Sequence, residues 1–308
     1  MDPKHRIITI LSQSDDVVSG ETLSRQLGIS RVSIWKHIQG LIQAGTPVVS
    51  SPKGYRLVRD PDRLSAWEWG GWQDRVHFFQ EIPSTMDEAL ALARRGCPDF
   101  SVVVAQRQTR GRGRMQRTWL SNQGGLYFTV VLRPRIAVMQ AGLLNLATAI
   151  DMAALLRAAY QVDARVKWPN DILVGHQKIC GILSQMEAEG DQVGYVNIGV
   201  GLNVNNAPET EEPSAASLKT LTGRPVPRRE ILVAFLNAFQ QRLFNFDAAA
   251  VVEQWRACNL TLGRRVRVAT LKAWVEGTAI DLDAQGGLII RLADGTCQTV
   301  LFGDCFHQ

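Results

Sequence analysis

An arginine-rich segment between two apolar stretches is the feature that most constrains this 308-residue chain. Residues 101–105 and 126–132 are almost entirely apolar, and each stretch predicts a buried strand. The segment between them interleaves arginines with glycines: Arg107, Arg110, Gly111, Arg112, Gly113, Arg114 and Arg117. Arginines at alternate positions cannot share one face of a helix, and glycine widens the choice of backbone conformations, so we expect a loop.

A loop with this charge suits an anionic ligand, because the guanidinium fork matches carboxylate and phosphate oxygens. Taken by itself, the segment fits two other interpretations equally well. One is a solvated basic surface, and the other is an arginine–glycine segment that binds RNA. The choice among them depends on motifs elsewhere in the chain.

Composition bounds the class of protein. The length predicts two or three domains, and a hydrophobic share of 45% is enough for real cores. The net charge of +5 permits contact with nucleic acid without requiring it. The cysteines are scattered and odd in number, so we expect reduced thiols in a cytoplasmic protein. The longest apolar run, residues 141–160, contains Asp151 and Arg157 and predicts a buried helix, so we expect no membrane association.

Residues 1–60 have the pattern of a small DNA-binding module. After a first apolar helix, Ser19 and Ser30 are predicted N-caps, and Gly28 is the predicted left-handed stop between them. The third helix is expected over residues 31–44, and its apolar positions form one stripe: Ile34, Ile38, Leu41 and Ile42. A hairpin with a turn-rich tip follows at residues 48–57. This order predicts a winged helix-turn-helix.

The polar positions of this module are the expected DNA contacts. They are Thr22, Arg31, Ser33, Lys36, His37 and Lys53. Base edges would be read by Arg31, Ser33 and Lys36 near the start of the third helix. Trp35 lies at the edge of the apolar stripe, so we expect it to pack inside the module. The alternatives are a winged helix that binds protein instead of DNA and a vestigial one.

Three further motifs accompany the arginine loop: Ser84-Thr85-Met86, Lys-Trp-Pro-Asn-Asp at residues 167–171, and Lys-Ile-Cys-Gly-Ile-Leu at residues 178–183. In this order and spacing they resemble the biotin protein ligases, over nearly the whole chain. With the N-terminal module, the resemblance is to the bifunctional type that also represses transcription. It implies an α+β multidomain fold with a winged helix at 1–60, a central mixed sheet with helices at 61–260, and an SH3-like β-barrel at 261–308.

The resemblance also implies roles for individual residues. Biotin would contact Ser84, Thr85, Met86, Gln108, Arg112, Gly113, Arg114 and Lys178, of which Arg112, Arg114 and Lys178 would be catalytic. ATP would contact Trp119 and Asn203, and Asp171 would help to hold magnesium. Two positions depart from the family pattern, because Met86 replaces an asparagine and Gln116 replaces a glycine. No phosphate-binding P-loop is present, so ATP would have to use the arginine loop and the sheet.

The implied activity has two parts. Biotin and MgATP would give biotinyl-5′-AMP, and biotin would pass to a lysine of a biotin carboxyl carrier protein. The adenylate-bound protein would form a homodimer on operator DNA. Residues 205–217 are expected to form a flap over the nucleotide. A lipoate-type acyl-adenylating ligase and a ligand-sensing repressor without ligase activity are the alternatives.

Overall fold

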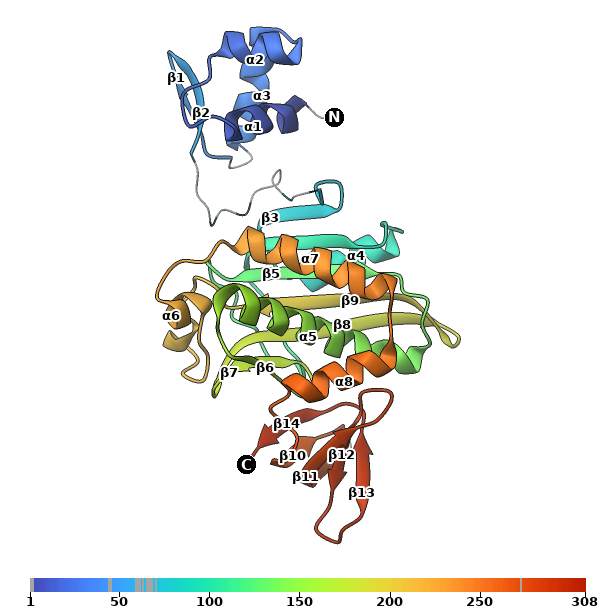
Figure 1. Ribbon diagram of the computed structural model, residues 1–308. Helices are drawn as coiled ribbons and strands as arrows, with labels where there is room; N and C mark the ends of the chain where they lie inside the picture. Colours follow the sequence, from blue (N-terminus) through green and yellow to red (C-terminus); the bar gives the residue numbers. More distant parts are fainter. Residues whose placement is uncertain are drawn as a thin grey trace. The chain divides into compact units, whose positions relative to one another are not determined.

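The computed structural model describes residues 3–43, 46–58, 62, 64, 69, 71–271 and 273–308 (Figure 1). The chain divides into two compact units, Met1–Gln73 and Asp74–Gln308, and each is described by itself. Pro61, the first residue of the predicted central domain, lies outside the described residues. Ala44, the predicted last residue of the third helix, also lies outside them.

The first unit is a winged helix-turn-helix, as predicted. Its elements are α1 (Pro3–Ser12), α2 (Gly20–Leu27), α3 (Arg31–Gln43), β1 (Val48–Ser51) and β2 (Gly54–Leu57). The backbone N–H of Thr22 donates to Oγ of Ser19 over 3.0 Å, and Gly28 has a φ of 68°. Both predicted caps of α2 are therefore confirmed.

Trp35 corrects one prediction about this unit. Ile34, Ile38 and Leu41 of α3 are fully buried, whereas 52% of Trp35 is exposed. Each residue of a helix is turned by about 100° from its neighbour. The step from Ile34 to Trp35 therefore carries the indole off the buried stripe and onto the surface, so the expectation that it packs inside is wrong.

A seven-stranded sheet forms the centre of the second unit. In spatial order its strands are β3 (Val76–Ile82), β4 (Ser101–Gln108), β5 (Leu126–Leu132), β9 (Gln192–Leu202), β8 (Gln177–Glu189), β7 (Asp171–Val174) and β6 (Ala164–Lys167). The pair β3–β4 is parallel, and the remaining pairs are antiparallel. The predicted strand at residues 126–132 is confirmed as β5.

Helices cover both faces of this sheet. Phe128 of β5 packs against Phe235 of α7 (Arg228–Phe244), with the two rings tilted at 56°, while Val131, three residues later, packs with Ala89 of α4 (Thr85–Arg94). Alternate residues of a strand point to opposite faces, so α4 and α7 lie on opposite sides. The other helices are α5 (Ala141–Tyr160), α6 (Leu218–Thr222) and α8 (Ala248–Cys258).

The long helix α5 is a core helix. The stretch Val138–Tyr160 is long and apolar enough to cross a membrane, but 56% of its most apolar window is buried inside the protein. Its buried side includes Leu143, Ala147 and Leu156, and Figure 1 shows it lying across the sheet beside α7 and α8. The prediction of a buried helix is confirmed.

The C-terminal segment forms a separate five-stranded antiparallel sheet of SH3-like type. Its spatial order is β13 (Cys297–Val300), β12 (Leu288–Arg291), β11 (Trp274–Leu282), β10 (Arg265–Ala269) and β14 (Asp304–His307). The last strand had no signal in the sequence. Trp168 ties this sheet to the larger one, because its backbone N–H donates to Thr261 and its indole N–H donates to the carbonyl of Gly286, each over 3.0 Å.

Candidate active site

One cavity of about 350 Å³ lies on the α4 side of the large sheet, under the arginine loop. It contains every residue that the sequence assigned to biotin, ATP or magnesium. They are Ser84, Thr85, Met86, Gln108, Arg112, Gly113, Arg114, Trp119, Asp171, Lys178 and Asn203. These residues come from the start of α4, the end of β4, the loop, and strands β7 to β9. The folded chain therefore brings together motifs that are far apart in the sequence.

The start of α4 forms a neutral polar end of this cavity. Ser84 caps the helix, and its Oγ accepts from the backbone N–H of Met86. The N–H and Oγ1 of Thr85 both donate to Oε1 of Gln108, over 2.7 and 3.0 Å. Nε2 of Gln108 then donates to Ser121 over 2.8 Å. This network fixes the orientation of the Gln108 amide, so the polar groups at this end are held in place before a ligand arrives.

Glycines make the floor of the cavity, and Trp119 lies over them. A Cβ added at Gly201 would be 2.3 Å from Nε1 of Trp119, and one at Gly181 would be 2.8 Å from the same ring. Nζ of Lys178 lies 5.3 Å from the centre of this ring, within cation–π range. Any side chain at Gly181 or Gly201 would displace the indole. The result is a flat apolar region between the polar end and the charged end.

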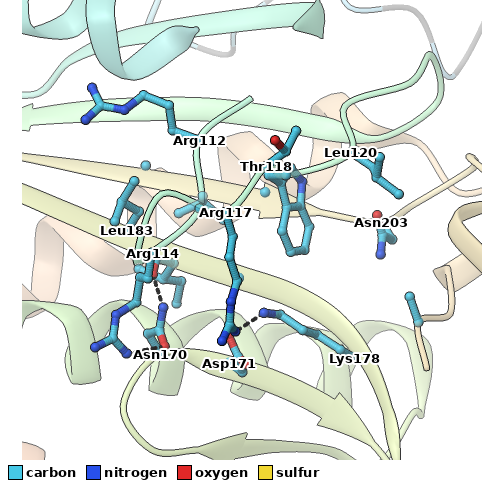
Figure 2. A pocket seen from close by; sticks show the side chains of 18 of the residues that line it. Arg112, Arg114, Arg117, Thr118, Leu120, Asn170, Asp171, Lys178, Leu183 and Asn203 are labelled. Carbon is cyan, nitrogen blue, oxygen red and sulfur yellow. Dashed lines mark hydrogen bonds and ion pairs between the residues drawn. The ribbon is translucent and has the colours of Figure 1, made fainter. Parts of the chain in front are cut away.

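The charged end is built where β7 and β8 meet (Figure 2). Nζ of Lys178 lies 2.7 Å from Oδ1 of Asp171. Nη1 of Arg114 donates to Oδ1 of Asn170 over 3.0 Å, and Asn170 in turn donates from Nδ2 to the carbonyl of Ile182. A guanidinium and an ammonium group therefore share one end of the cavity.

The C-terminal sheet holds the arginine loop from the other side. Asp304, which is 9% exposed, lies 2.8 Å from Arg117 and 3.8 Å from Arg114. Arg114 also donates to the carbonyl of Gly303 over 2.9 Å. Arg112 is placed differently, because its Nη1 donates to Asp87 of α4 over 2.8 Å. Figure 2 shows its guanidinium extending away from Lys178.

Burial shifts the pKa of two groups near the charged end. It lowers the pKa of Arg114 from its usual value, while Asp304 and Asp171 raise that pKa. Arginine starts far above neutral pH, so the guanidinium keeps its charge. Burial raises the pKa of the Cys180 thiol well above its usual range. Cys180 therefore stays a neutral thiol and does not act as a nucleophile.

The residues present fit a magnesium ion that is held mainly by its ligand. Among the described residues, no three histidine, cysteine or acidic side chains cluster as a metal site would require. Asp171 nevertheless places one carboxylate at the charged end, 22% exposed and next to Lys178. Magnesium typically takes one or two carboxylates, with substrate phosphates and water completing its shell.

Sequence reasoning left Arg117 and Asp304 out of the site. Arg117 belonged to the recognised loop, but nothing in its local pattern singled it out. Asp304 follows Gly303 in a short segment with no apolar alternation, so neither its strand nor its contact with the loop had a local signal. Residues 205–217 were expected to form a flap over the nucleotide. In the structure this segment contacts the start of β8, because the backbone N–H of Lys178 donates to the carbonyl of Ser214 over 2.8 Å.

The predicted DNA contacts lie on the first unit. Arg31, Lys36 and Lys53 are exposed, whereas Thr22, Ser33 and His37 are half-buried. The side-chain hydroxyls of Thr22 and Ser33 lie 2.9 and 3.0 Å from the N-cap hydroxyls of Ser19 and Ser30. These two residues therefore contribute to the helix caps as well as to the surface.

Comparison with known proteins agrees with this architecture. The model of the biotin/lipoate A/B protein ligase family matches residues 78–203, an HTH domain matches residues 4–56, and the biotin protein ligase C terminal domain matches residues 261–308. The bifunctional ligase/repressor BirA of Bacillus spizizenii is 34% identical over 94% of both chains. That of Escherichia coli is 30% identical over 97% of this chain and 95% of its own.

Solved structures agree as well. A biotin protein ligase from Aquifex aeolicus in complex with biotin and ATP is 28% identical, with a TM-score of 0.65 over 76% of this chain and 98% of its own. A ligase catalytic region joined to a helix-turn-helix domain is thus the class that the fold and the cavity define. The chain belongs to the biotin protein ligase family and, within it, to the bifunctional ligase/repressors.

Proposed function

We propose that this protein is an ATP-dependent biotin protein ligase that forms biotinyl-5′-AMP and transfers biotin to a lysine of a biotin carboxyl carrier protein. The observation that carries the proposal is the polarity of the cavity. Its neutral polar end lies at Thr85 and Gln108, its cationic end at Arg114 and Lys178, and Leu183, which pairs with Gly199, adds an apolar side chain to the lining. Biotin has the same sequence of groups: a ureido ring, an apolar body and a carboxylate.

The cationic end would promote the first step. The carboxylate of biotin attacks the α-phosphorus of ATP, and pyrophosphate leaves. Two anions must approach each other, so their repulsion has to be offset. Arg114 and Lys178 would hold the carboxylate and an α-phosphate oxygen together and stabilise the negative charge that develops between them. Arg112 and Gly113 would join this end when the loop rearranges around the ligand.

The polar and apolar regions would position the rest of both substrates. Ser84, Thr85 and Gln108 would take the ureido ring, with Met86 packed against Gly199 behind them. Trp119 and Asn203 would contact the adenine. Asn203 is 3% exposed, and its Oδ1 accepts from Asn206 over 2.9 Å, which keeps the side chain in one orientation.

Asp171 would hold magnesium together with the phosphates of ATP. Magnesium, when bound, neutralises phosphate charge and polarises the phosphorus. Asp171 is already paired with Lys178, so the same carboxylate also orients the ammonium group in the absence of substrates.

The second step needs no nucleophile from the enzyme. The amine of the carrier lysine attacks the carbonyl of the mixed anhydride, AMP leaves, and an amide forms. The anhydride must be kept from water until the carrier arrives. The arginine loop is suited to this task because Asp304 and Asn170 hold its arginines over the cavity.

The second proposed activity is repression of transcription. The adenylate-bound protein would dimerise and place two winged helices on a two-fold symmetric operator.

The proposed domains are a DNA-binding domain at 1–60, a catalytic domain at 61–260 and an SH3-like domain at 261–308. The cysteines among the described residues are all free, which supports a reducing compartment such as the cytoplasm.

Mass spectrometry tests the ligase. The purified protein is incubated with MgATP and an equal mixture of biotin and lipoate, followed by a carrier domain. We expect biotinyl-AMP and a biotinylated carrier lysine. Lipoyl-AMP would instead support the lipoate-type alternative and would indicate that Met86 changes the ligand choice. No acyl-AMP of either kind would support a ligand-sensing repressor without ligase activity.

A further inference from the structure

Two large apolar side chains lie on the exposed face of α3, near the start of the helix. Val32 is 64% exposed and Trp35 is 52% exposed. They are three residues apart and so neighbour each other on the helix surface. Arg31 and Lys36, the residues just before and just after them, are exposed as well. The face is therefore an apolar centre with cationic edges.

This face lines a groove of about 620 Å³ in the first unit. The groove runs between the start of α2, the exposed side of α3 and the hairpin tip at Pro52 and Lys53. The hairpin is fixed to the body of the unit, because Val18 and Tyr55 exchange two backbone hydrogen bonds of 2.8 and 2.9 Å. The groove is therefore held open before any partner binds.

We propose that Val32 and Trp35 read thymine methyl groups in the operator, an inference that rests on the proposed repressor function. The thymine 5-methyl is the apolar group that base pairs present in the major groove, where a recognition helix lies. Lys53 on the hairpin tip reaches a phosphate beside this contact. Arg31 and Lys36 lie next to it as the expected contacts with base edges. Glu21 also lines the groove, where a carboxylate can accept from the amino group of a cytosine.

The charge of the rim favours DNA over a protein partner. The side chains around Val32 and Trp35 are mainly cationic, which complements a phosphate backbone. An apolar contact and a phosphate contact also have different signatures. The affinity of a phosphate contact falls as salt increases and hardly depends on sequence, whereas an apolar contact with a base depends on sequence and leaves the salt dependence unchanged.

The test uses the full-length protein with biotin and MgATP. A duplex is first selected from a random-sequence pool by the wild-type protein. We expect Trp35→Ala to weaken binding to this duplex about tenfold or more. Its binding to mixed-sequence DNA and the salt dependence of its binding should stay as in the wild type. Lys53→Ala should instead lower the salt dependence on both DNAs. Val17→Ala, which changes an exposed apolar residue of the same unit, is the matched control.

Replacing the thymines of the selected duplex by uracil tests the same contact without changing the protein. We expect the wild type to lose affinity for at least one such replacement, and Trp35→Ala to be insensitive to that one. Equal binding of Trp35→Ala and the wild type, or indifference of the wild type to every replacement, would overturn the inference. Failure of the wild type to enrich any duplex would instead reject the repressor function on which the inference rests.

Discussion

Nζ of Lys178 and Oδ1 of Asp171 are 2.7 Å apart at the charged end of the cavity. The lysine is 35% exposed and the aspartate 22%, so both remain accessible to a ligand. Their charges compensate each other in the absence of substrates. The pairing keeps the ammonium group near the place where a carboxylate and a phosphate would meet.

Lys178→Ala should remove most of the adenylation activity. Losing one preorganised charge at a developing anion reduces kcat by about 100- to 1,000-fold. Pyrophosphate release in the presence of biotin and MgATP measures this step. Lys219→Ala, which changes an exposed lysine on α6, is the control and should keep full activity. A Lys178→Ala protein with normal pyrophosphate release would contradict the assigned role.

Gly201→Ala should impair nucleotide binding. The added Cβ would be 2.3 Å from Nε1 of Trp119, so the indole has to leave its position over the floor. We expect a raised KM for ATP, measured by pyrophosphate release, and weaker ATP binding by calorimetry. Gly142→Ala is the matched control, because its Cβ meets its nearest neighbour at 3.5 Å and alanine favours the helix α5. Unchanged ATP binding in Gly201→Ala would mean that Trp119 does not contact the nucleotide.

Asp304→Asn should release the arginine loop from the C-terminal sheet. The substitution keeps the size of the side chain but removes the charge that pairs with Arg117 and Arg114. We expect stability to fall by about 1–3 kcal/mol, with faster proteolysis of the loop and slower adenylation. Glu276→Gln removes an exposed ion pair with Arg267 in the same sheet and should cost less than about 1 kcal/mol. Similar effects of the two substitutions would argue against a specific clamp.

His307 should make the protein less stable in acid. Burial, with Lys167 and Arg264 nearby, lowers its pKa from 6.5 to about 4. Between pH 4 and pH 6.5 the imidazole of His307 is therefore protonated in the unfolded chain and neutral in the folded protein. This contribution to stability is fully present above pH 6.5 and is lost as pH falls towards 4.

Denaturant unfolding of the wild type and His307→Gln at several pH values measures this contribution. The wild type should lose more free energy of unfolding between pH 6.5 and 4 than the variant does. Glutamine can still hydrogen-bond to Thr261, whose Oγ1 lies 3.3 Å from Nε2 of His307. Parallel stability curves for the two proteins would show that His307 does not titrate as its surroundings indicate.

Local rules determined a large part of this fold from the sequence. Ser19 and Gly28 bound α2 because a cap depends on residues within one turn. The segment Leu126–Leu132 is almost entirely apolar, and this composition alone predicted a strand that is buried on both faces. The order of the ligase motifs was also enough to predict which residues would line one cavity.

Tertiary structure decided what depends on contacts between distant segments. Trp35 lies one step beyond a buried stripe, and only the direction of α3 within the folded unit shows that the indole faces a groove. Asp304 became part of the site because its strand pairs with β10 and carries it beneath Arg117. A sequence pattern records the periodicity of a single element. It does not record which distant element will meet it, because that choice is made by burial across the whole chain.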